Sequence, residues 1–260
     1  MILTLDIGNT NIKTALFDGE EMLNYWRIAT NQTASSDEYG MLLVKLFSYN
    51  NRDISDVTGV VISSVVPSVN FTIEHMCRNY LGQAPMMINA GLDTGLKIDY
   101  DNAGELGSDR IANAVAAYQI YGGPCIFIDF GTATSFGVVS QDGRFLGGAI
   151  CPGIKLSAES LVEHAAKLPR FELQRPKSVI GKNTITNLQS GIVFGHVGVV
   201  SYLIKRMKEE LNAPDARVIA TGGMALLVSD ETDDINVLDG LLTLKGLRIL
   251  YERNHGKIAK

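Results

Sequence analysis

The chain has 260 residues, a net charge of −5, 46% hydrophobic residues and 20% charged residues. This composition supports a buried core and argues against long disordered segments. Lys and Arg form no cluster beyond Lys205, Arg206 and Lys208, which argues against nucleic acid as a partner.

The first half of the chain predicts a hairpin followed by alternating helices and strands. Segment 91–107 is rich in Gly, Asp and Asn and predicts a loop. The expected strands are 2–6, 11–17, 22–29, 57–65 and 85–88, and the expected helices are 36–49, one that starts at Pro67, and 109–121.

The second half repeats this order. Its expected strands are 125–129, 133–140, 144–150 and 216–220, and its expected helices are 153–167, 186–211, 222–228 and 239–253. Hairpin strands followed by helix–strand–helix units, occurring twice, predict a duplicated α/β architecture. We expect one domain over residues 1–118 and a second over residues 119–260.

The cysteines and the N-terminal residues indicate the compartment. Cys77, Cys125 and Cys151 are widely spaced without a Cys-x-x-Cys pair, which is typical of free thiols in a reducing environment. The chain starts with a strand-like run rather than with the basic and apolar regions of a signal peptide. No apolar run approaches the roughly 20 residues of a membrane span. We expect a cytoplasmic protein without a membrane partner.

A similar hairpin starts each half. Asp6-Ile7-Gly8-Asn9-Thr10 and Asp129-Phe130-Gly131-Thr132 both end an apolar strand with Asp-x-Gly. Glycine in a tight turn lets backbone N–H groups approach an anion, and the Asn and Thr side chains add neutral donors. The pair of turns therefore predicts two phosphate-binding loops.

The aspartates of these turns imply a cation. Asp6 or Asp129 about 4 Å from a phosphate oxygen would cost on the order of 4 kcal/mol at an effective dielectric near 20. A Mg²⁺ ion between the two groups would turn this repulsion into attraction, which predicts a metal–nucleotide ligand such as ATP with Mg²⁺. The alternative is that both are ordinary turn residues. The sequence has neither a P-loop nor a Gly-x-Gly-x-x-Gly motif.

Two further segments fit a kinase. Gly222-Gly223 follow a strand and would let an adenosine lie close to the backbone, or they serve an unusual strand-to-helix turn. Gly107-Ser108-Asp109-Arg110 stand at a helix start, with Ser108 as the expected N-cap. Asp109 could accept the proton of a substrate hydroxyl and Arg110 could bind a carboxylate, whereas the alternative is a solvated ion pair near the positive end of the helix dipole.

These motifs together identify a resemblance. The chain resembles type III pantothenate kinases, of the acetate and sugar kinase/heat-shock chaperone/actin superfamily, over essentially its full length. The motifs are weak singly and specific in this order and spacing. They are Asp6–Thr10, Ile62–Pro67, Gly107–Arg110, Asp129–Thr134, Gly147–Gly153, Ala166–Pro169, Asn183–Thr184, Gln189–Gly191 and Thr221–Gly223.

The resemblance implies a fold and a reaction. The fold would be α/β, with two ribonuclease-H-like (actin-like ATPase) domains, mixed sheets flanked by helices and a nucleotide cleft between them. The reaction would be ATP-dependent phosphorylation of pantothenate to 4′-phosphopantothenate, the first step of coenzyme A biosynthesis. The family works as a homodimer and requires Mg²⁺ and a monovalent cation, K⁺ or NH₄⁺.

The resemblance also implies roles for individual residues. Asp109 would accept the proton of the pantothenate hydroxyl, and Asp129 would bind the monovalent cation. Thr184 would contact substrate across the homodimer interface. The remaining sets are a nucleotide site of Asp6, Ile7, Gly8, Asn9, Thr10, Asn11, Ile12, Lys13 and Thr132, and a pantothenate pocket of Tyr100, Gly107, Ser108, Asp109 and Arg110.

Two positions depart from the family pattern. Ser108 stands where Ala is more frequent, and Gly137 stands where many members have Asp, which puts the cation dependence in doubt. The histidines show no metal-ligand spacing and receive no catalytic role. Gly191 and Gly195 predict either close helix packing, as at a dimer interface, or a helix break.

Two other functions remain as alternatives. One is a regulatory accessory protein that binds nucleotide or pantothenate without turnover. The other is a kinase of a different small alcohol. The intact phosphate loops and Asp109 favour an enzyme, and the absence of a basic stretch argues against direct DNA contact.

Overall fold

The computed structural model describes the backbone of residues 1–258 and the side chains of residues 1–255. The chain divides into two compact units. The first unit comprises Met1–Leu96, Tyr100–Ala116 and the residues from Leu242 on, and the second comprises Lys97–Asp99 and Ala117–Leu241.

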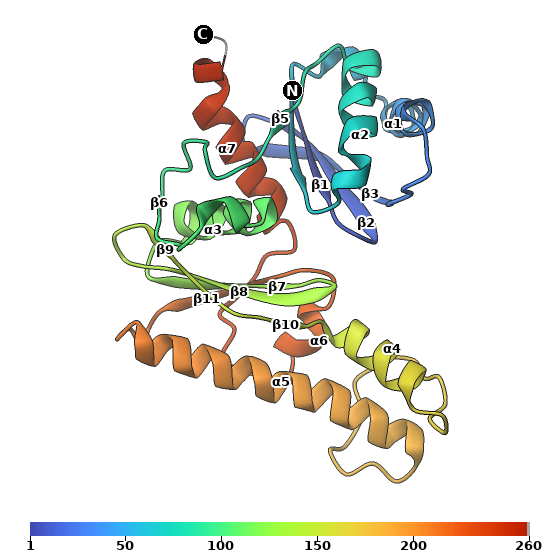
Figure 1. Cartoon of the computed structure of the whole chain (residues 1–260), viewed down its shortest axis with the longest axis vertical. Coiled ribbons are helices and arrows are strands. Elements are labelled where there is room, and N and C mark those ends of the chain that lie inside the picture. The colour runs from blue at the N-terminus through green and yellow to red at the C-terminus, as the bar shows by residue number, and fades with distance from the viewer. Residues whose placement is uncertain (259–260) are drawn as a thin grey trace. The chain divides into compact units, whose positions relative to one another are not determined.

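The first unit contains a mixed sheet (Figure 1). Within residues 1–258 its strand order is β3-β2-β1-β4-β5. β1 pairs antiparallel with β2 and parallel with β4, so β1 is central and its apolar residues are buried. The strands are β1 (Ile2–Ile7), β2 (Asn11–Asp18), β3 (Glu21–Ala29), β4 (Gly59–Ser64) and β5 (Met86–Met87).

Helices cover this sheet. α1 (Ser36–Tyr49) starts with a capping box of Ser35 and Glu38, and α2 (Pro67–Tyr80) starts with its proline in the first turn. Leu3, Leu5 and Ile7 form one hydrophobic core with residues of both helices. Thr4 and Asp6 alternate with these residues and therefore lie on the other face of the sheet.

The last helix, α7 (Leu242–Ile258), packs against β1, β2 and β4 of the first unit. Gly59 allows this close approach, because a Cβ there would lie 1.9 Å from the Tyr251 hydroxyl. Gly246 lets α7 also approach the backbone of Ala112, since a Cβ at 246 would lie 2.0 Å from the Ala112 carbonyl oxygen. This assignment differs from the sequence-based division at 118/119, which placed the whole C-terminal segment in the second domain. Local patterns do not reveal which sheet a terminal helix covers.

The second unit also contains a mixed sheet (Figure 1). Within residues 1–258 its strand order is β12-β11-β7-β8-β9-β6, and β10 pairs with β8. Ile126, Ile128 and Phe130 face the helices α4 (Ile154–His164), α5 (Thr184–Glu210) and α6 (Ala225–Ser229) in one core. The strands are β6 (Lys97–Ile98), β7 (Cys125–Phe130), β8 (Ala133–Val139), β9 (Arg144–Gly147), β10 (Ile150–Pro152), β11 (Arg217–Thr221) and β12 (Val237–Leu238).

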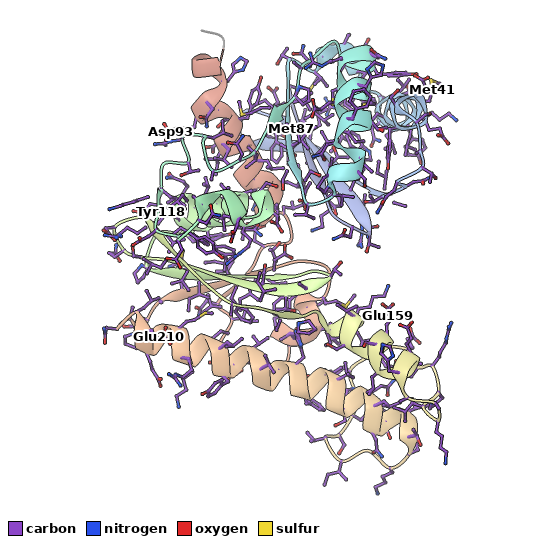
Figure 2. The ribbon with its side chains drawn as sticks, viewed as in Figure 1. Met41, Met87, Asp93, Tyr118, Glu159 and Glu210 are labelled. Atoms are coloured by element: carbon purple, nitrogen blue, oxygen red, sulfur yellow. The ribbon has the colours of Figure 1, made fainter. Side chains whose placement is uncertain are left out.

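Several elements differ from the sequence prediction. The expected strand 144–150 is two strands, because Gly147 has a φ of 110° and the chain turns there before β10. The expected loop 91–107 contains β6 and a short 3₁₀ helix over Ala103–Glu105. Helix α3 (Ser108–Tyr121) matches its prediction within one residue. Tyr118, labelled in Figure 2, lies near the end of this helix, and its hydroxyl donates to the Gln141 carbonyl at 3.4 Å.

Helix α5 decides between the two interpretations of Gly191 and Gly195. It runs unbroken through Gly191 and Gly195, so the interpretation of these residues as a helix break is wrong. Both positions are exposed, and a Cβ at either would meet no atom within 4 Å. Among the described residues, α5 is the helix long and apolar enough to span a bilayer by length and composition, yet Val193, Val200 and Ile204 pack in the core of the second unit.

Candidate active site

The first hairpin places Asp6 at the buried end of β1. Asp6 is 9% exposed, and its Oδ2 lies 3.7 Å from Nζ of Lys13, its register partner on β2. β1 ends at Ile7 and β2 begins at Asn11, so the connecting loop is residues 8–10, and the Gly8 N–H donates to the Asn11 carbonyl at 3.0 Å. The hairpin therefore combines a carboxylate and an ammonium group beside a glycine turn.

A residue that the sequence analysis missed supports this loop. The Thr30 hydroxyl donates to the Gly8 carbonyl at 2.6 Å, and the Thr30 N–H donates to the Thr10 carbonyl at 3.0 Å. Asn9 and Thr10 remain exposed at the tip, where their side chains can reach a ligand. Thr30 follows β3 without a motif, so only the strand pairing reveals its role.

The second hairpin has a shorter loop. β7 ends at Phe130 and β8 begins at Ala133, so the loop is residues 131–132, and the Gly131 N–H donates to the Ala133 carbonyl at 3.0 Å. Thr132 is exposed in this loop. Asp129 ends up opposite Ser135, a neutral residue, whereas Asp6 lies opposite a lysine. The two hairpins thus differ in charge.

Strand β11 borders Asp129 on its other side. Thr221 is the register partner of Asp129, is 1% exposed, and its hydroxyl oxygen has no hydrogen-bond partner within the described chain. Gly222 follows with a φ of 97°, and a Cβ there would lie 2.5 Å from Asp129 Oδ1 and 2.5 Å from the Phe130 nitrogen. Glycine is required at 222 for this turn, and Gly223 is open, with no atom within 4 Å of an added Cβ.

A buried histidine supports the second hairpin. His196 on α5 is 8% exposed, and its Nε2 lies 3.0 Å from the Thr134 hydroxyl. Its ring meets the Phe130 ring edge-on at 6.1 Å. Burial lowers the pKa of His196 below its ordinary value, because the charged form loses its hydration. His196 had received no role from the sequence, since no spacing connects it to the hairpin.

Helix α3 starts at the expected tetrapeptide, but Ser108 is not its N-cap. The helix begins at Ser108, and the Gly107 carbonyl accepts the N–H of Ile111 at 3.1 Å. The Ser108 hydroxyl instead contacts β4, 3.0 Å from both the Ser63 hydroxyl and the Ser64 nitrogen. The prediction of a cap was wrong because a strand end competes for the same hydroxyl.

Asp109 and Arg110 face different surroundings. Asp109 is half-buried, and its Oδ1 accepts the N–H of Arg110 at 2.8 Å. A Cβ at Gly107 would lie 2.6 Å from this Oδ1, so glycine leaves room for the carboxylate. Arg110 is 7% exposed, and its guanidinium carbon lies 5.9 Å from the Tyr100 ring centroid. A buried cation beside an aromatic ring is not the solvated pair of the alternative interpretation.

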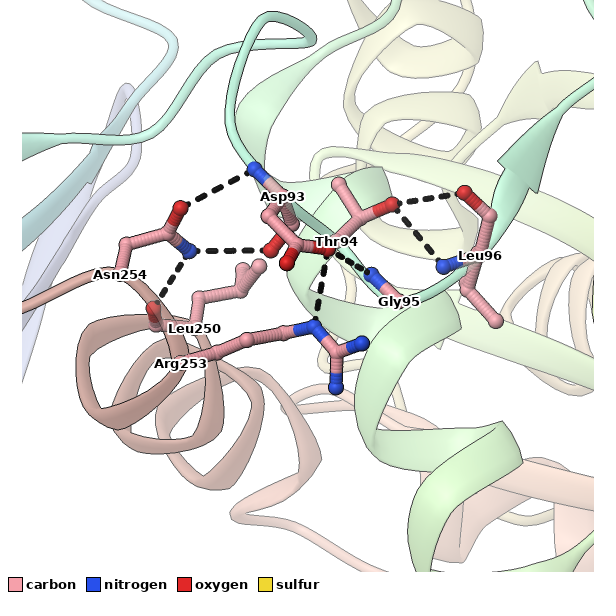
Figure 3. A network of polar contacts seen from close by, with 7 residues as sticks. All are labelled: Asp93, Thr94, Gly95, Leu96, Leu250, Arg253 and Asn254. Atoms are coloured by element: carbon pink, nitrogen blue, oxygen red, sulfur yellow. Dashed lines mark hydrogen bonds and ion pairs between the residues drawn. The ribbon is translucent and has the colours of Figure 1, made fainter. Parts of the chain in front are cut away.

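The loop that leads to Tyr100 is fastened to α7 (Figure 3). Arg253 Nε lies 2.9 Å from Asp93 Oδ1, and Asn254 exchanges hydrogen bonds with the Asp93 backbone at 3.0 and 2.9 Å. The Thr94 hydroxyl donates to the Leu96 carbonyl at 3.0 Å. Asn254 is 3% exposed, so this network fixes the start of the loop from a buried position.

The departure at Gly137 has a packing explanation. A Cβ at Gly137 would lie 2.0 Å from a ring carbon of Phe127, on the neighbouring strand β7. Phe127 stacks on Phe145 with ring centroids 6.3 Å apart. In this chain an aromatic ring fills the space that a side chain at 137 would need.

The predicted residues gather in two groups. Asp6 to Lys13, Tyr100 and Gly107 to Arg110 belong to the first unit, and Asp129, Thr132 and Thr184 belong to the second. Thr184 is the exposed first residue of α5, after the Asn183 cap. Among the described residues, no three His, Cys, Asp or Glu side chains form a metal-binding group.

The comparison with protein families gives a match over most of the chain. The model described as type III pantothenate kinase matches residues 2–206. This range contains both hairpins, the start of α3 and Thr184, and it ends within α5.

Solved structures share the fold. A conserved Baf family protein from Campylobacter jejuni, described as a proposed transcriptional activator, has a TM-score of 0.62 and 20% identity, covering 98% of this chain and 99% of that one. The (R)-2-hydroxyglutaryl-CoA dehydratase component A of Acidaminococcus fermentans has a TM-score of 0.56 and 15% identity, with 100% and 99% covered. EutJ, an ethanolamine utilization protein of Carboxydothermus hydrogenoformans, has a TM-score of 0.52 and 12% identity, with 95% and 89% covered. At these identities the likeness shows the duplicated α/β fold alone.

Proposed function

Because this chain belongs to the type III pantothenate kinase family, we propose that it transfers the γ-phosphoryl group of ATP to the hydroxyl of pantothenate through the residues described above. The products are ADP and 4′-phosphopantothenate. The single observation that carries the assignment of residues is the start of α3, where a half-buried carboxylate, Asp109, directly precedes a buried guanidinium, Arg110.

Asp109 is the proposed proton acceptor. The pantothenate hydroxyl oxygen attacks the γ-phosphorus, the bond from phosphorus to the bridging oxygen of ADP breaks, and the hydroxyl proton passes to the Asp109 carboxylate. The contact between Asp109 Oδ1 and the Arg110 N–H fixes the carboxylate over its own helical turn. A carboxylate on a rigid helix needs little reorganisation when the substrate binds.

Arg110 is the proposed partner of the pantothenate carboxylate. Its guanidinium is buried beside the Tyr100 ring, and a buried cation gains most from an anionic ligand. Tyr100 would also provide an apolar wall for the pantothenate chain. The network of Asp93, Arg253 and Asn254 holds the loop before Tyr100 in place.

The hairpin loops are the proposed phosphate contacts. Lys13 supplies positive charge and the exposed tip residues Asn9 and Thr10 supply side-chain and backbone donors in the first, and Thr132 supplies a hydroxyl in the second. Phosphates neutralised by donors in this way can be held without a P-loop. Mg²⁺ enters with the nucleotide, and Asp6 is the carboxylate of the first hairpin that suits it.

Asp129 and Thr221 fit a monovalent cation. A carboxylate and a neighbouring buried hydroxyl without a hydrogen-bond partner form an oxygen-rich donor set, which hard cations prefer. A bound K⁺ or NH₄⁺ ion would supply positive charge near the phosphates. Ser135, opposite Asp129, adds a further hydroxyl to this face of the sheet.

The exposed face of α5 is the proposed homodimer contact. Gly191 and Gly195 present backbone without side chains to solvent, and Thr184 stands at the start of the same helix. A partner helix could therefore approach closely there and bring its own substrate near Thr184. The free Cys77, Cys125 and Cys151 fit a reducing cytoplasm, which we propose as the compartment.

A coupled assay of ADP release tests this function. With pantothenate, ATP, Mg²⁺ and K⁺, we expect turnover that falls at least about 100-fold in Asp109→Asn, because the neutral amide cannot accept the proton. Omission of pantothenate should abolish ADP release. Turnover of the wild type no faster than that of Asp109→Asn would contradict the role of Asp109, and no turnover with pantothenate would favour the accessory protein.

A further inference from the structure

A buried pair of hydroxyls joins β4 to the start of α3 (Ser63 and Ser108, here the serine pair). Ser63 is 0% exposed and Ser108 is 9% exposed, and their oxygens are 3.0 Å apart. The Ser64 N–H donates to the Ser108 hydroxyl at 3.0 Å, and the Ser108 hydroxyl lies 3.2 Å from the Ser64 carbonyl. One donor and two acceptor positions of Ser108 are therefore used, which makes this a complete network.

The serine pair neighbours two carboxylates with proposed roles, Asp6 and Asp109. Ser63 is the register partner of Asp6 on the adjacent parallel strand, so both side chains leave the same face of the sheet. Ser108 is bonded directly along the chain to Asp109. The pair thus connects the end of β4, next to Asp6 on β1, to the helical turn that contains Asp109.

The hydrogen bonds of Asp109 and Ser108 in the first turn of α3 differ in their reach along the chain. The Asp109 carboxylate accepts a hydrogen bond from its own turn, through the Arg110 N–H, and this contact moves with the helix. The Ser108 hydroxyl instead reaches residues 44 and 45 positions away in the sequence. This long-range contact ties the first turn of α3 to the end of β4, beside the buried packing of Ile111.

We propose that Ser63 and Ser108 are positioning residues that fix the place of the Asp109 carboxylate relative to the end of β1, where Asp6 lies. The inference rests on the proposed role of Asp109 as proton acceptor. In-line phosphoryl transfer depends on placement of the attacking hydroxyl, and a shift of about 1 Å can cost 10²-fold in rate. The resemblance assigned Ser108 to the pantothenate pocket, but its hydroxyl is taken up by Ser63 and Ser64, so the serine pair acts on turnover through Asp109.

The serine pair allows a test that separates an effect on the position of Asp109 from an effect on the stability of the fold. Ser108→Ala leaves the buried Ser63 hydroxyl without the partner it has here, so we expect a lower unfolding midpoint, by about 3 °C. Ser63→Ala/Ser108→Ala removes both hydroxyls and should recover only the part of that loss that comes from the unpaired Ser63 hydroxyl, since the Ser64 N–H still lacks Ser108. We expect kcat to fall about tenfold in both variants, with the KM for ATP unchanged, because the turn is released in both.

A double-mutant cycle with Asp109→Asn shows whether Ser108 affects turnover through the Asp109 carboxylate. Added to Asp109→Asn, Ser108→Ala should lower the residual single-turnover rate no further, since there is no carboxylate left to position. The control is Ser68→Ala on α2, whose exposed hydroxyl donates to Gln32 at 3.2 Å and which should match the wild type.

The outcomes distinguish this inference from the proposed function. A kcat of Ser108→Ala equal to that of the wild type would overturn the inference, as would the same tenfold loss in the Asp109→Asn background. Recovery of kcat together with stability in the double variant would also overturn it. If Asp109→Asn itself turns over like the wild type, the proposed function of Asp109 fails first.

Discussion

The two hairpins that look equivalent in the sequence place their aspartates in different electrostatic surroundings. In the first, Asp6 lies across from Lys13 with their charged atoms 3.7 Å apart, and in the second, Asp129 lies across from Ser135 and beside the Thr221 hydroxyl. The same Asp-x-Gly turn therefore stands beside a fixed cation in one unit and beside neutral oxygens in the other.

One residue of loop length causes this difference. The first loop is residues 8–10 and the second is residues 131–132. Because side chains alternate between the faces of a strand, one residue more or less changes which side chain lies opposite the aspartate. With a loop one residue longer, Asp129 would pair with Phe136, a buried core residue, instead of Ser135. Loop length thus places a lysine opposite one aspartate and a serine opposite the other.

Exchanging Asp6 or Asp129 for asparagine should have the largest effect, which we expect on the rate of ADP release. We expect Asp6→Asn to lower kcat at least about 100-fold in either K⁺ or Na⁺, because it removes the proposed carboxylate for the metal–nucleotide complex. Asp129→Asn should lower the K⁺ rate to the Na⁺ rate, so that the preference for potassium disappears. Initial rates of ADP release in matched salts measure both.

A matched control stands at the far end of the first hairpin. Asp18 is exposed in the Asp-Gly turn after β2, and Asp18→Asn should keep both the rate and the cation preference. If Asp129→Asn retains the preference for K⁺ over Na⁺, the cation does not depend on Asp129, and the difference between the hairpins is structural only.

Substitution of glycines probes how tightly each aspartate is enclosed. We expect Gly222→Ala to lower the free energy of unfolding by about 2–4 kcal/mol, because its φ of 97° disfavours a side chain and the added Cβ would meet Asp129 and Phe130 at 2.5 Å. Gly8→Ala should cost about 1 kcal/mol or less, since its nearest contact is the Asn11 carbonyl at 3.2 Å. Urea unfolding measures both values.

Gly223→Ala is the control for this comparison. Its added Cβ would meet no atom within 4 Å, and we expect unfolding within about 0.5 kcal/mol of the wild type. Equal losses in Gly222→Ala and Gly223→Ala would mean that the enclosure of Asp129 does not determine the stability of this turn.

The sequence predicted what depends on local pattern and missed what depends on pairing. Strands with buried alternation and helices with N-terminal signals, such as Pro67, were found within a few residues, and the duplicated α/β fold is confirmed. The two-residue strands β6 and β12 are too short for a periodic pattern. Ser63, Thr30 and His196 reach the hairpins or α3 only through tertiary contacts, which no motif encodes.

The smallest effect should be on the pH dependence of stability, because the two hairpins are contacted by different residues, His196 and Thr30. His196 contacts the second through Thr134, and burial lowers the pKa of His196 in the folded state relative to about 6.5 when unfolded. The unfolded chain therefore binds the proton first, and stability falls as the pH drops below about 6.5, by at most about 1.4 kcal/mol per pH unit. Thr30, which supports the first hairpin, does not titrate in this range.

Replacement of His196 by glutamine should therefore remove part of the pH dependence. His196→Gln keeps a polar contact for Thr134 but cannot titrate, so its unfolding free energy should change by about 1 kcal/mol less than that of the wild type between pH 7.5 and 5.5. Urea unfolding at several pH values measures this, with Asn70→Gln on α2, which replaces one amide by another, as the control for the substitution itself. An unchanged slope in His196→Gln would mean that the imidazole takes up its proton without loss of the Thr134 contact, and the two hairpins would then respond alike to acid.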